Sequence, residues 1–429
     1  MYFGTEAAGM RRAAYYSSNF VKWSLLATFV GLFVGGISTL FGHLLLFVNS
    51  YRYAHERVVW LLPLAGLAIV FLYRISDSAN PRGTNLVIEA ARSEEKLPAR
   101  MAPLIFVSTI LTHLCGGSAG REGAALQLGG SLGQLLGDKL RIEEENRNIM
   151  VMCGMSAGFS ALFGTPIAAA IFPLGLASIG MIYYTALVPC TISSLVSYWV
   201  ALYFGLSPER FHLAAFETTP ILALRVVLLA VLCAVVSILM CAVLHQTGKL
   251  FQSIFPNQYL RIVVGGSLVC LAAALFGRDY LGAGMHIIER AIEGEATPAA
   301  FLLKLLFTAV TLGAGFKGGE VVPSFFVGAT FGCVAGPLLG LSAEFAAAVG
   351  LVAVFCAAVN CPMASIFLSV ELFGDGGLLY FALICGVSYM LSGYNGLYSS
   401  QTILYSKLKA KYINVHTNAH HAGEKDEIL

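Results

Sequence analysis

Two glutamates stand in stretches of sequence that are otherwise small or apolar, and both are candidates for ion or proton chemistry. Glu122 follows Arg121 in GGSAGREGAALQLGG, residues 116–130, and Glu320 lies in GGEVVPSFFVGATFG, which begins at Gly318. An ionisable side chain within a membrane span is costly unless it is paired or protonated, so its presence suggests a function. A carboxylate beside backbone amide donors can occupy an anion site and leave it on protonation, which would couple anion movement to proton movement.

Both glutamates also have a structural interpretation. In that alternative, Glu122 is a neutral acid or one that is paired with Arg121, and Glu320 is a fixed acceptor that supports the start of a helix.

The composition indicates an integral membrane protein. Hydrophobic residues make up 57% of the 429 residues and charged residues only 12%, well outside the range of soluble globular proteins. A spanning helix needs roughly 20 apolar residues, and uncharged runs of at least that length occur at 24–50, 148–208, 226–248, 321–343 and 345–370. Prolines interrupt the second of these runs, which therefore comprises several segments that turn inside the membrane or at its edge.

The charged residues bear on partners and orientation. The net charge of +2 does not suggest nucleic acid as a partner. Basic residues flank the apolar region on both sides: Arg11, Arg12, Lys22, Lys407, Lys409 and Lys411. The positive-inside rule therefore predicts that both termini are cytoplasmic. The ten cysteines are scattered without a CxxC pair, so we expect buried small hydrophobes, with neither a metal site nor a cofactor.

The chain contains an internal repeat. Glu122 and Glu320 are 198 residues apart, and the prolines of FGTPIAAAIF and VNCPMASIF, Pro166 and Pro362, are 196 residues apart. Two landmarks at nearly one offset indicate a duplicated unit, and transporters built from such repeats hold their substrate site at the repeat interface. The predicted division is an N-terminal segment (1–22), a first repeat (23–208), a linker (209–225), a second repeat (226–405) and a tail (406–429).

Each landmark is also a predicted helix start. Glycine-rich turns precede apolar residues at both glutamates, and Pro166 and Pro362 suit the first turn of a helix. Four interrupted helices would then point their amide ends inward and form an anion site. In the alternative interpretation, the glycines only allow close packing of helices.

Other function classes find little support. The G-x-S-x-G pattern at 116–120 follows an apolar segment instead of a strand, and GAGFKG at 313–318 lacks the setting of a dinucleotide site. A membrane-embedded enzyme would need a nucleophile with a base at catalytic spacing, which we do not find, so the protein is not expected to be an enzyme. A receptor or scaffold has no need for two acids at matching repeat positions.

These motifs resemble the CLC family of anion channels and anion–proton antiporters. The resemblance rests on GREG at 120–123, the two proline helix starts and GLYSS at 396–400, and it covers about 21–405. It implies an all-α membrane protein of two inverted-topology repeats with interrupted, re-entrant helices, which forms a homodimer in the bacterial inner membrane. By this likeness Glu122 corresponds to the external gating glutamate and Tyr398 to the tyrosine that faces the central anion. As an alternative, Tyr398 belongs to an interfacial aromatic belt.

Two departures from the chloride-transporting pattern favour fluoride. GTNLV at 83–87 replaces G-S-G-I-P and lacks its serine, and GGEVVP at 318–323 replaces G-x-F-x-P. The GGE-V form resembles the fluoride–proton antiporter branch, which also lacks the serine and which Thr84 and Asn85 match in part. The predicted function is fluoride export in exchange for protons, and the alternative is a chloride-transporting CLC antiporter or channel. Glu122 and Glu320 are the predicted coupling acids, and the predicted anion-binding residues are Thr84, Asn85, Gly120, Arg121, Gly123, Val321, Val322 and Tyr398.

Overall fold

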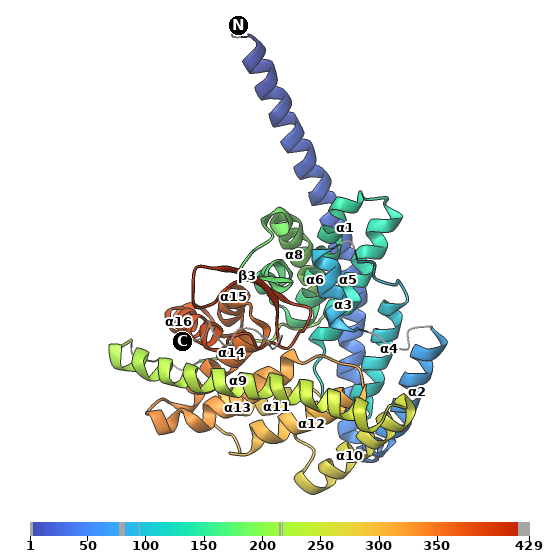
Figure 1. Cartoon of the computed structure of the whole chain (residues 1–429), viewed down its shortest axis with the longest axis vertical. Helices are drawn as coiled ribbons and strands as arrows, with labels where there is room; N and C mark the ends of the chain where they lie inside the picture. Colours follow the sequence, from blue (N-terminus) through green and yellow to red (C-terminus); the bar gives the residue numbers. More distant parts are fainter. Residues whose placement is uncertain (1–2, 77–81, 94, 214–215, 217, 419–429) are drawn as a thin grey trace.

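The computed structural model describes residues 3–76, 82–93, 95–213, 216 and 218–418 (Figure 1). Parts of four predicted segments lie outside these residues, namely 1–2 of the N-terminal segment, 77–81 and 94 of the first repeat, 214–215 and 217 of the linker, and 419–429 of the tail.

The described chain is built mainly from helices, in two halves with the same element order. The first half contains α1 (Phe3–Ala54), α2 (Leu62–Ile75), α3 (Thr84–Arg92), α4 (Met101–Leu114), α5 (Glu122–Lys139), α6 (Arg147–Phe163), α7 (Pro166–Leu176) and α8 (Leu187–Tyr203). The second contains α9 (Pro220–Ile254), α10 (Gln258–Phe276), α11 (Met285–Ile292), α12 (Ala300–Ala314), α13 (Val321–Ala335), α14 (Ala343–Val359), α15 (Pro362–Phe373) and α16 (Leu378–Leu391). Short 3-10 helices connect some of them: η1 (Glu56–Leu61), η2 (Glu144–Asn146), η3 (Tyr184–Ala186), η4 (Pro337–Leu339) and η5 (Asp375–Gly377).

Helix lengths also repeat between the halves. The short third helices α3 and α11 have 9 and 8 residues, and α6 and α14 have 17 each. The long uncharged run 148–208 comprises α6, α7 and α8, as predicted, because Pro166 begins α7 and Pro189 lies in the first turn of α8. Pro173, the third proline of this run, lies inside α7 and does not separate two segments. The division of the chain into five segments stays a prediction, although α9 already begins at Pro220, within the expected linker.

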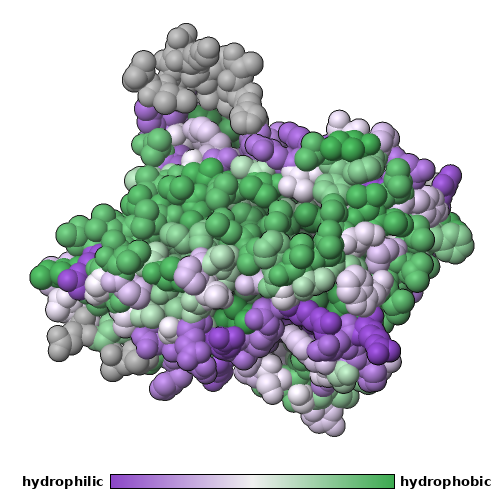
Figure 2. Space-filling view, turned by 90° about the horizontal axis from the view of Figure 1, so that it is seen from below, coloured by the Kyte–Doolittle hydropathy of each residue, from purple (hydrophilic) through white to green (hydrophobic). Residues whose placement is uncertain are grey.

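The surface has the character of a membrane protein. Among the described residues, five helices are long and apolar enough to cross a membrane: Arg12–Ala54, Glu56–Ile75, Tyr184–Tyr203, Pro220–Ile254 and Gln258–Phe276. Figure 2 shows a broad hydrophobic belt on one face, with hydrophilic residues along its edge. All ten cysteines are free and buried, which confirms that they act as small apolar side chains.

Glycines bring α5 and α6 into backbone contact, and α13 and α14 repeat this packing. A Cβ on Gly129 would lie 2.1 Å from the carbonyl oxygen of Gly154, and a Cβ on Gly328 would lie 2.3 Å from that of Gly350. The alternative interpretation of the glycines therefore applies here, inside each half, where only glycine allows the helices to approach so closely.

A small sheet accompanies the helices. Strand β1 (Ser178–Ile179) runs parallel to β2 (Thr402–Tyr405), which is antiparallel to β3 (Tyr412–His416) with Thr402 opposite His416. The sequence predicted only helices and a separate tail from 406. Residues 406–418 instead return to the helical body, because β3 satisfies the open edge of β2.

The contact between α5 and α6 yields a stability prediction. Gly154→Ala should lower the thermal midpoint of the purified protein, because the new methyl group meets a backbone carbonyl and such overpacking costs about 1–3 kcal/mol. Gly386→Ala is the matched control, since nothing lies within 4 Å of a Cβ at that position in α16. Thermal unfolding in detergent, followed by size-exclusion chromatography, measures both. Equal midpoints for the two variants would contradict this packing.

Candidate functional site

The two halves meet at a pair of backbone hydrogen bonds. The amide of Gly120 donates to the carbonyl of Gly319 at 2.7 Å, and the amide of Gly319 donates to the carbonyl of Gly120 at 2.8 Å. These equivalent segments pair in antiparallel fashion, as a two-fold relation between the halves requires. Both positions need glycine, because a Cβ on Gly319 would lie 2.5 Å from the amide nitrogen of Gly123. Helices α5 and α13 begin two residues after this pairing, so their amide ends lie together.

The Glu122 carboxylate lies at this junction and contacts both halves. Its side chain is fully buried, and Oε2 accepts hydrogen bonds from the amide of Arg121 at 2.9 Å and from the amide of Val322 at 3.3 Å. One carboxylate oxygen thus binds amides at the starts of helices from both halves, where the helix dipoles favour a negative charge. Oε1 has no hydrogen-bond partner among the described residues, although it lies 3.7 Å from the Nε of Arg121.

Arg121 contributes its backbone amide to the junction, and its side chain extends from Glu122 to Glu209. Its Nη2 forms an ion pair with Glu209 Oε1 at 2.8 Å. Glu209 belongs to the predicted linker, and the sequence analysis did not connect it with the site. The guanidinium therefore lies between two carboxylates, which offsets part of the cost of burying Glu122.

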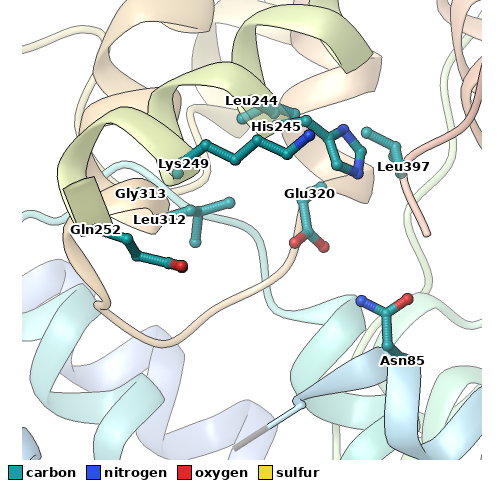
Figure 3. Close-up of a pocket in the computed structure, with 10 residues that line it drawn as sticks. Asn85, Leu244, His245, Lys249, Gln252, Leu312, Gly313, Glu320 and Leu397 are labelled. Atoms are coloured by element: carbon teal, nitrogen blue, oxygen red, sulfur yellow. The ribbon is translucent and has the colours of Figure 1, made fainter. Parts of the chain in front are cut away.

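Glu320 lies on the other side of the junction and borders two cavities. It precedes the first residue of α13, and its Oε2 is buried without a partner in the described structure. One cavity has a volume of about 300 Å³ and the other about 150 Å³. Figure 3 shows the carboxylate pointing into the larger one. Because both cavities border Asn85, Leu312, Glu320 and Leu397, these residues form the wall between them.

The start of α3 supplies two polar side chains. Thr84 Oγ1 accepts from Gln127 Nε2 at 3.0 Å, which leaves its own hydroxyl hydrogen for another acceptor. Asn85 Oδ1 accepts from the amide and the hydroxyl of Ser400 at 3.1 and 2.9 Å. Because the backbone amide of Ser400 can only donate, the Asn85 atom that it contacts must be the side-chain oxygen. The Asn85 side-chain nitrogen then lies on the cavity side, as Figure 3 shows.

Tyr398 is buried in the same region. Only 1% of the residue is exposed, and its hydroxyl has no hydrogen-bond partner among the described residues. It borders the smaller cavity together with Glu320 and Thr84. This burial contradicts the alternative of an aromatic belt at the membrane surface.

The other two predicted helix starts do not reach this junction. The first amides of α7, those of Ile167 and Ala168, both donate at 2.8 Å to the carboxylate of Glu371 from α15. The start of α15 at Pro362 borders a separate cavity with Ile171 and Tyr389. The expectation that four helix starts converge is therefore wrong. The starts of α3, α5 and α13 contribute instead, because an acid of the opposite half already satisfies α7.

The structure thus brings together all ten predicted site residues around one junction, but it adds others. The sequence analysis missed Gln127, Glu209, Ser400 and the three polar residues of α9 that border the larger cavity, His245, Lys249 and Gln252. A polar residue on an apolar helix is a usable signal for these three residues of α9, whereas the others depend on contacts between distant segments.

A membrane protein whose two halves meet at a buried carboxylate and paired helix starts has the architecture of an ion-transport protein. Residues 65–393 match the family model described as voltage gated chloride channel. The chain therefore belongs to the CLC family, and the fold is the CLC fold.

Three relatives illustrate the range of this family. A chloride/fluoride channel protein of Pseudomonas syringae pv. tomato is 36% identical over 397 residues, which cover 90% of this chain and 87% of the relative. The H(+)/Cl(-) exchange transporter ClcA of Yersinia pestis is 26% identical, over 81% of this chain and 79% of the relative. The crystal structure of a CLC-type fluoride/proton antiporter superposes with a TM-score of 0.86 at 33% identity, covering 89% of this chain and 98% of the other.

Gly123 offers a test of the site geometry. A Cβ at this position would lie 3.3 Å from Thr84 Oγ1 and 3.5 Å from Glu320 Oε2. Gly123→Ala should therefore reduce anion flux in liposomes by about tenfold, in line with the effect of a small misplacement at a reacting centre. Gly36→Ala, in α1, is the control, because nothing lies within 4 Å of its Cβ. Wild-type flux in Gly123→Ala would show that anions do not pass this point.

Proposed function

We propose that this protein exports fluoride in exchange for protons as an anion–proton antiporter of the CLC family. The observation that carries the proposal is the position of Glu122, whose carboxylate oxygen accepts amide hydrogen bonds from the starts of helices in both halves. A small anion needs these same donors. Glu122 and a transported anion therefore compete for one site, and they can exchange if Glu122 becomes protonated and leaves.

The neighbouring acid supports proton coupling. Glu320 lies at the start of α13, one residue before Val321 and two before the amide that binds Glu122, and it faces the larger cavity. It can thus receive a proton from the junction and release it to solvent. The cycle moves a proton through Glu122 and Glu320 in one direction and an anion in the other.

The donors near Glu320 favour fluoride. Fluoride is the smallest and most strongly hydrated halide, so its site must supply compact, strong hydrogen-bond donors. The Thr84 hydroxyl, the Asn85 amide nitrogen and a protonated Glu320 are donors of this kind. Two relatives, described as a chloride/fluoride channel protein and a CLC-type fluoride/proton antiporter, support this selectivity.

Chloride transport is the second candidate. It is favoured by the name of the Yersinia relative, an H(+)/Cl(-) exchange transporter, and by the mention of chloride in the name of the Pseudomonas relative. The buried carboxylate junction serves either anion, so selectivity distinguishes the two candidates.

The proposed setting is the bacterial inner membrane, where the protein forms a homodimer with both termini in the cytoplasm. The basic residues beside the first and last apolar runs support this orientation. The dimer rests on family likeness. Cross-linking in membranes and mass measurement in detergent would detect it.

Liposomes loaded with fluoride or chloride test the function directly. An ion-selective electrode records anion efflux, and a pH electrode records proton uptake. We expect a fluoride gradient to drive protons uphill and chloride efflux to be much slower. Chloride efflux with equal proton coupling would favour the second candidate, and anion efflux without proton movement would identify a channel.

Glu122→Gln should abolish proton coupling. The amide keeps the size of the side chain but cannot carry a proton, so fluoride exchange should fall by about 100-fold or more, the scale expected for loss of an acid–base group. Glu145→Gln, at an exposed position in η2, is the control. If Glu122→Gln still moved protons uphill on a fluoride gradient, Glu122 would have no part in coupling.

Glu320→Gln separates coupling from folding. The variant should elute as a single species, because the amide preserves shape, yet it should exchange fluoride for protons at least about tenfold more slowly. Glu320→Leu removes the donor as well and should reduce the preference for fluoride over chloride. Wild-type rate and selectivity in both variants would support the alternative that Glu320 only buttresses the helix start.

A further inference from the structure

The larger cavity is bordered by a histidine, His245, that has no role in the proposed transport cycle. His245 lies in α9, and the cavity that it borders also reaches Lys249, Gln252 and Glu320. Lys249 and Gln252 are exposed, and His245 is half-buried. Figure 3 shows the imidazole and the Glu320 carboxylate on the border of the same hollow, although they come from different helices.

Hydrogen bonds define which ring nitrogen of His245 carries the hydrogen in the neutral imidazole. Nδ1 lies 2.7 Å from the carbonyl oxygen of Cys241, which can only accept, so Nδ1 carries a hydrogen. Nε2 lies 3.5 Å from the side-chain nitrogen of Asn418, which can only donate. In the neutral ring Nε2 therefore presents a lone pair. Because its contact with Asn418 is long, protonation of Nε2 would remove only a weak hydrogen bond.

The C-terminal segment fixes Asn418 in this orientation. Its Oδ1 accepts from the amide of Gly396 at 3.1 Å, and its Nδ2 donates to the carbonyl of Gly396 at 2.9 Å. Its own amide donates to Tyr394 at 2.9 Å. The preceding Thr417 donates through Oγ1 to the carbonyl of Tyr398 at 2.6 Å. The segment that orients His245 thus also holds the loop that carries Tyr398.

The cavity is large enough to connect the two groups through water. A water molecule takes about 30 Å³ in the liquid, so a volume of about 300 Å³ accommodates several. Polar atoms of Asn85, Gln252, His245 and Glu320 border it and can order a short hydrogen-bonded chain.

We propose that His245 is the proton-transfer residue between Glu320 and the solvent on the cavity side. This inference rests on the proposed function. The Glu320 carboxyl gives its proton to cavity water, the water protonates Nε2, and the imidazolium then releases that proton to solvent near Lys249. The carboxylate and the neutral imidazole are regenerated, and no electrons move. Histidine suits this step because it gains and loses a proton near neutral pH.

Two charged groups border this path. Lys249 lies one turn further along α9, and Glu320 lies across the cavity. The residues from α12 that border the cavity, Leu312 and Gly313, carry no charge.

Chemical rescue tests the proposal. In liposomes at equal pH on both sides, His245→Ala should slow fluoride efflux by about tenfold or more, and added imidazole should restore much of the rate. Fluoride efflux is the measurement, because imidazole itself crosses bilayers. Wild-type protein with imidazole and His416→Ala, which removes an exposed histidine of β3, are the controls.

A second variant tests the proposal even if His245→Ala does not fold. His245→Gln keeps a hydrogen-bonding side chain, and it should lower the maximal fluoride rate without changing the fluoride KM. An unchanged rate in either variant, or slow efflux that imidazole does not restore, would overturn the proposal. If wild-type protein moves fluoride without protons, the proposed function fails first. If wild-type coupling is intact and the His245 variants match it, only this inference fails.

Discussion

Backbone amides inside a membrane protein must find acceptors, since no bulk water reaches them. At the centre of this protein, the starts of α5 and α13 leave amides that no helical turn satisfies. Two residues before these starts, the amides of Gly120 and Gly319 donate to each other's carbonyls, and the Glu122 carboxylate accepts from the amides of Arg121 and Val322. This arrangement joins the two halves and at the same time concentrates positive dipole ends at one point. Either a buried carboxylate or a bound anion can supply the negative charge that these amides and helix dipoles favour.

The polar groups around this junction form a graded path. Glu122 is fully buried, Glu320 borders the cavities and His245 lies nearer to the exposed Lys249. Contacts with distant segments reach Glu122 from Val322 and His245 from Asn418. Thr417, the residue after β3, donates through its hydroxyl to the carbonyl of Tyr398. The C-terminal segment therefore helps to position the site, and changes in this segment would displace the loop that carries Tyr398.

The sequence alone determined the class of protein and the positions of the acids. Uncharged runs longer than a bilayer requires admit only a membrane protein, and a duplicated pattern at nearly one offset fixes two equivalent halves. The glycine-rich turns at Glu122 and Glu320 predicted the starts of α5 and α13. Proline positions predicted the starts of α7 and α15. These are local properties, which depend on residue type and spacing.

The tertiary structure decided which of these elements meet, because hydrogen-bond partners far apart in the chain compete for each helix start. Glu371 satisfies α7, so that start does not serve the central site, whereas α3 joins it through Ser400 and Gln127. The return of the C-terminal hairpin and the placement of His245 opposite Glu320 likewise follow from packing between distant segments. A single sequence records the chemistry of each residue but not its distance from the others.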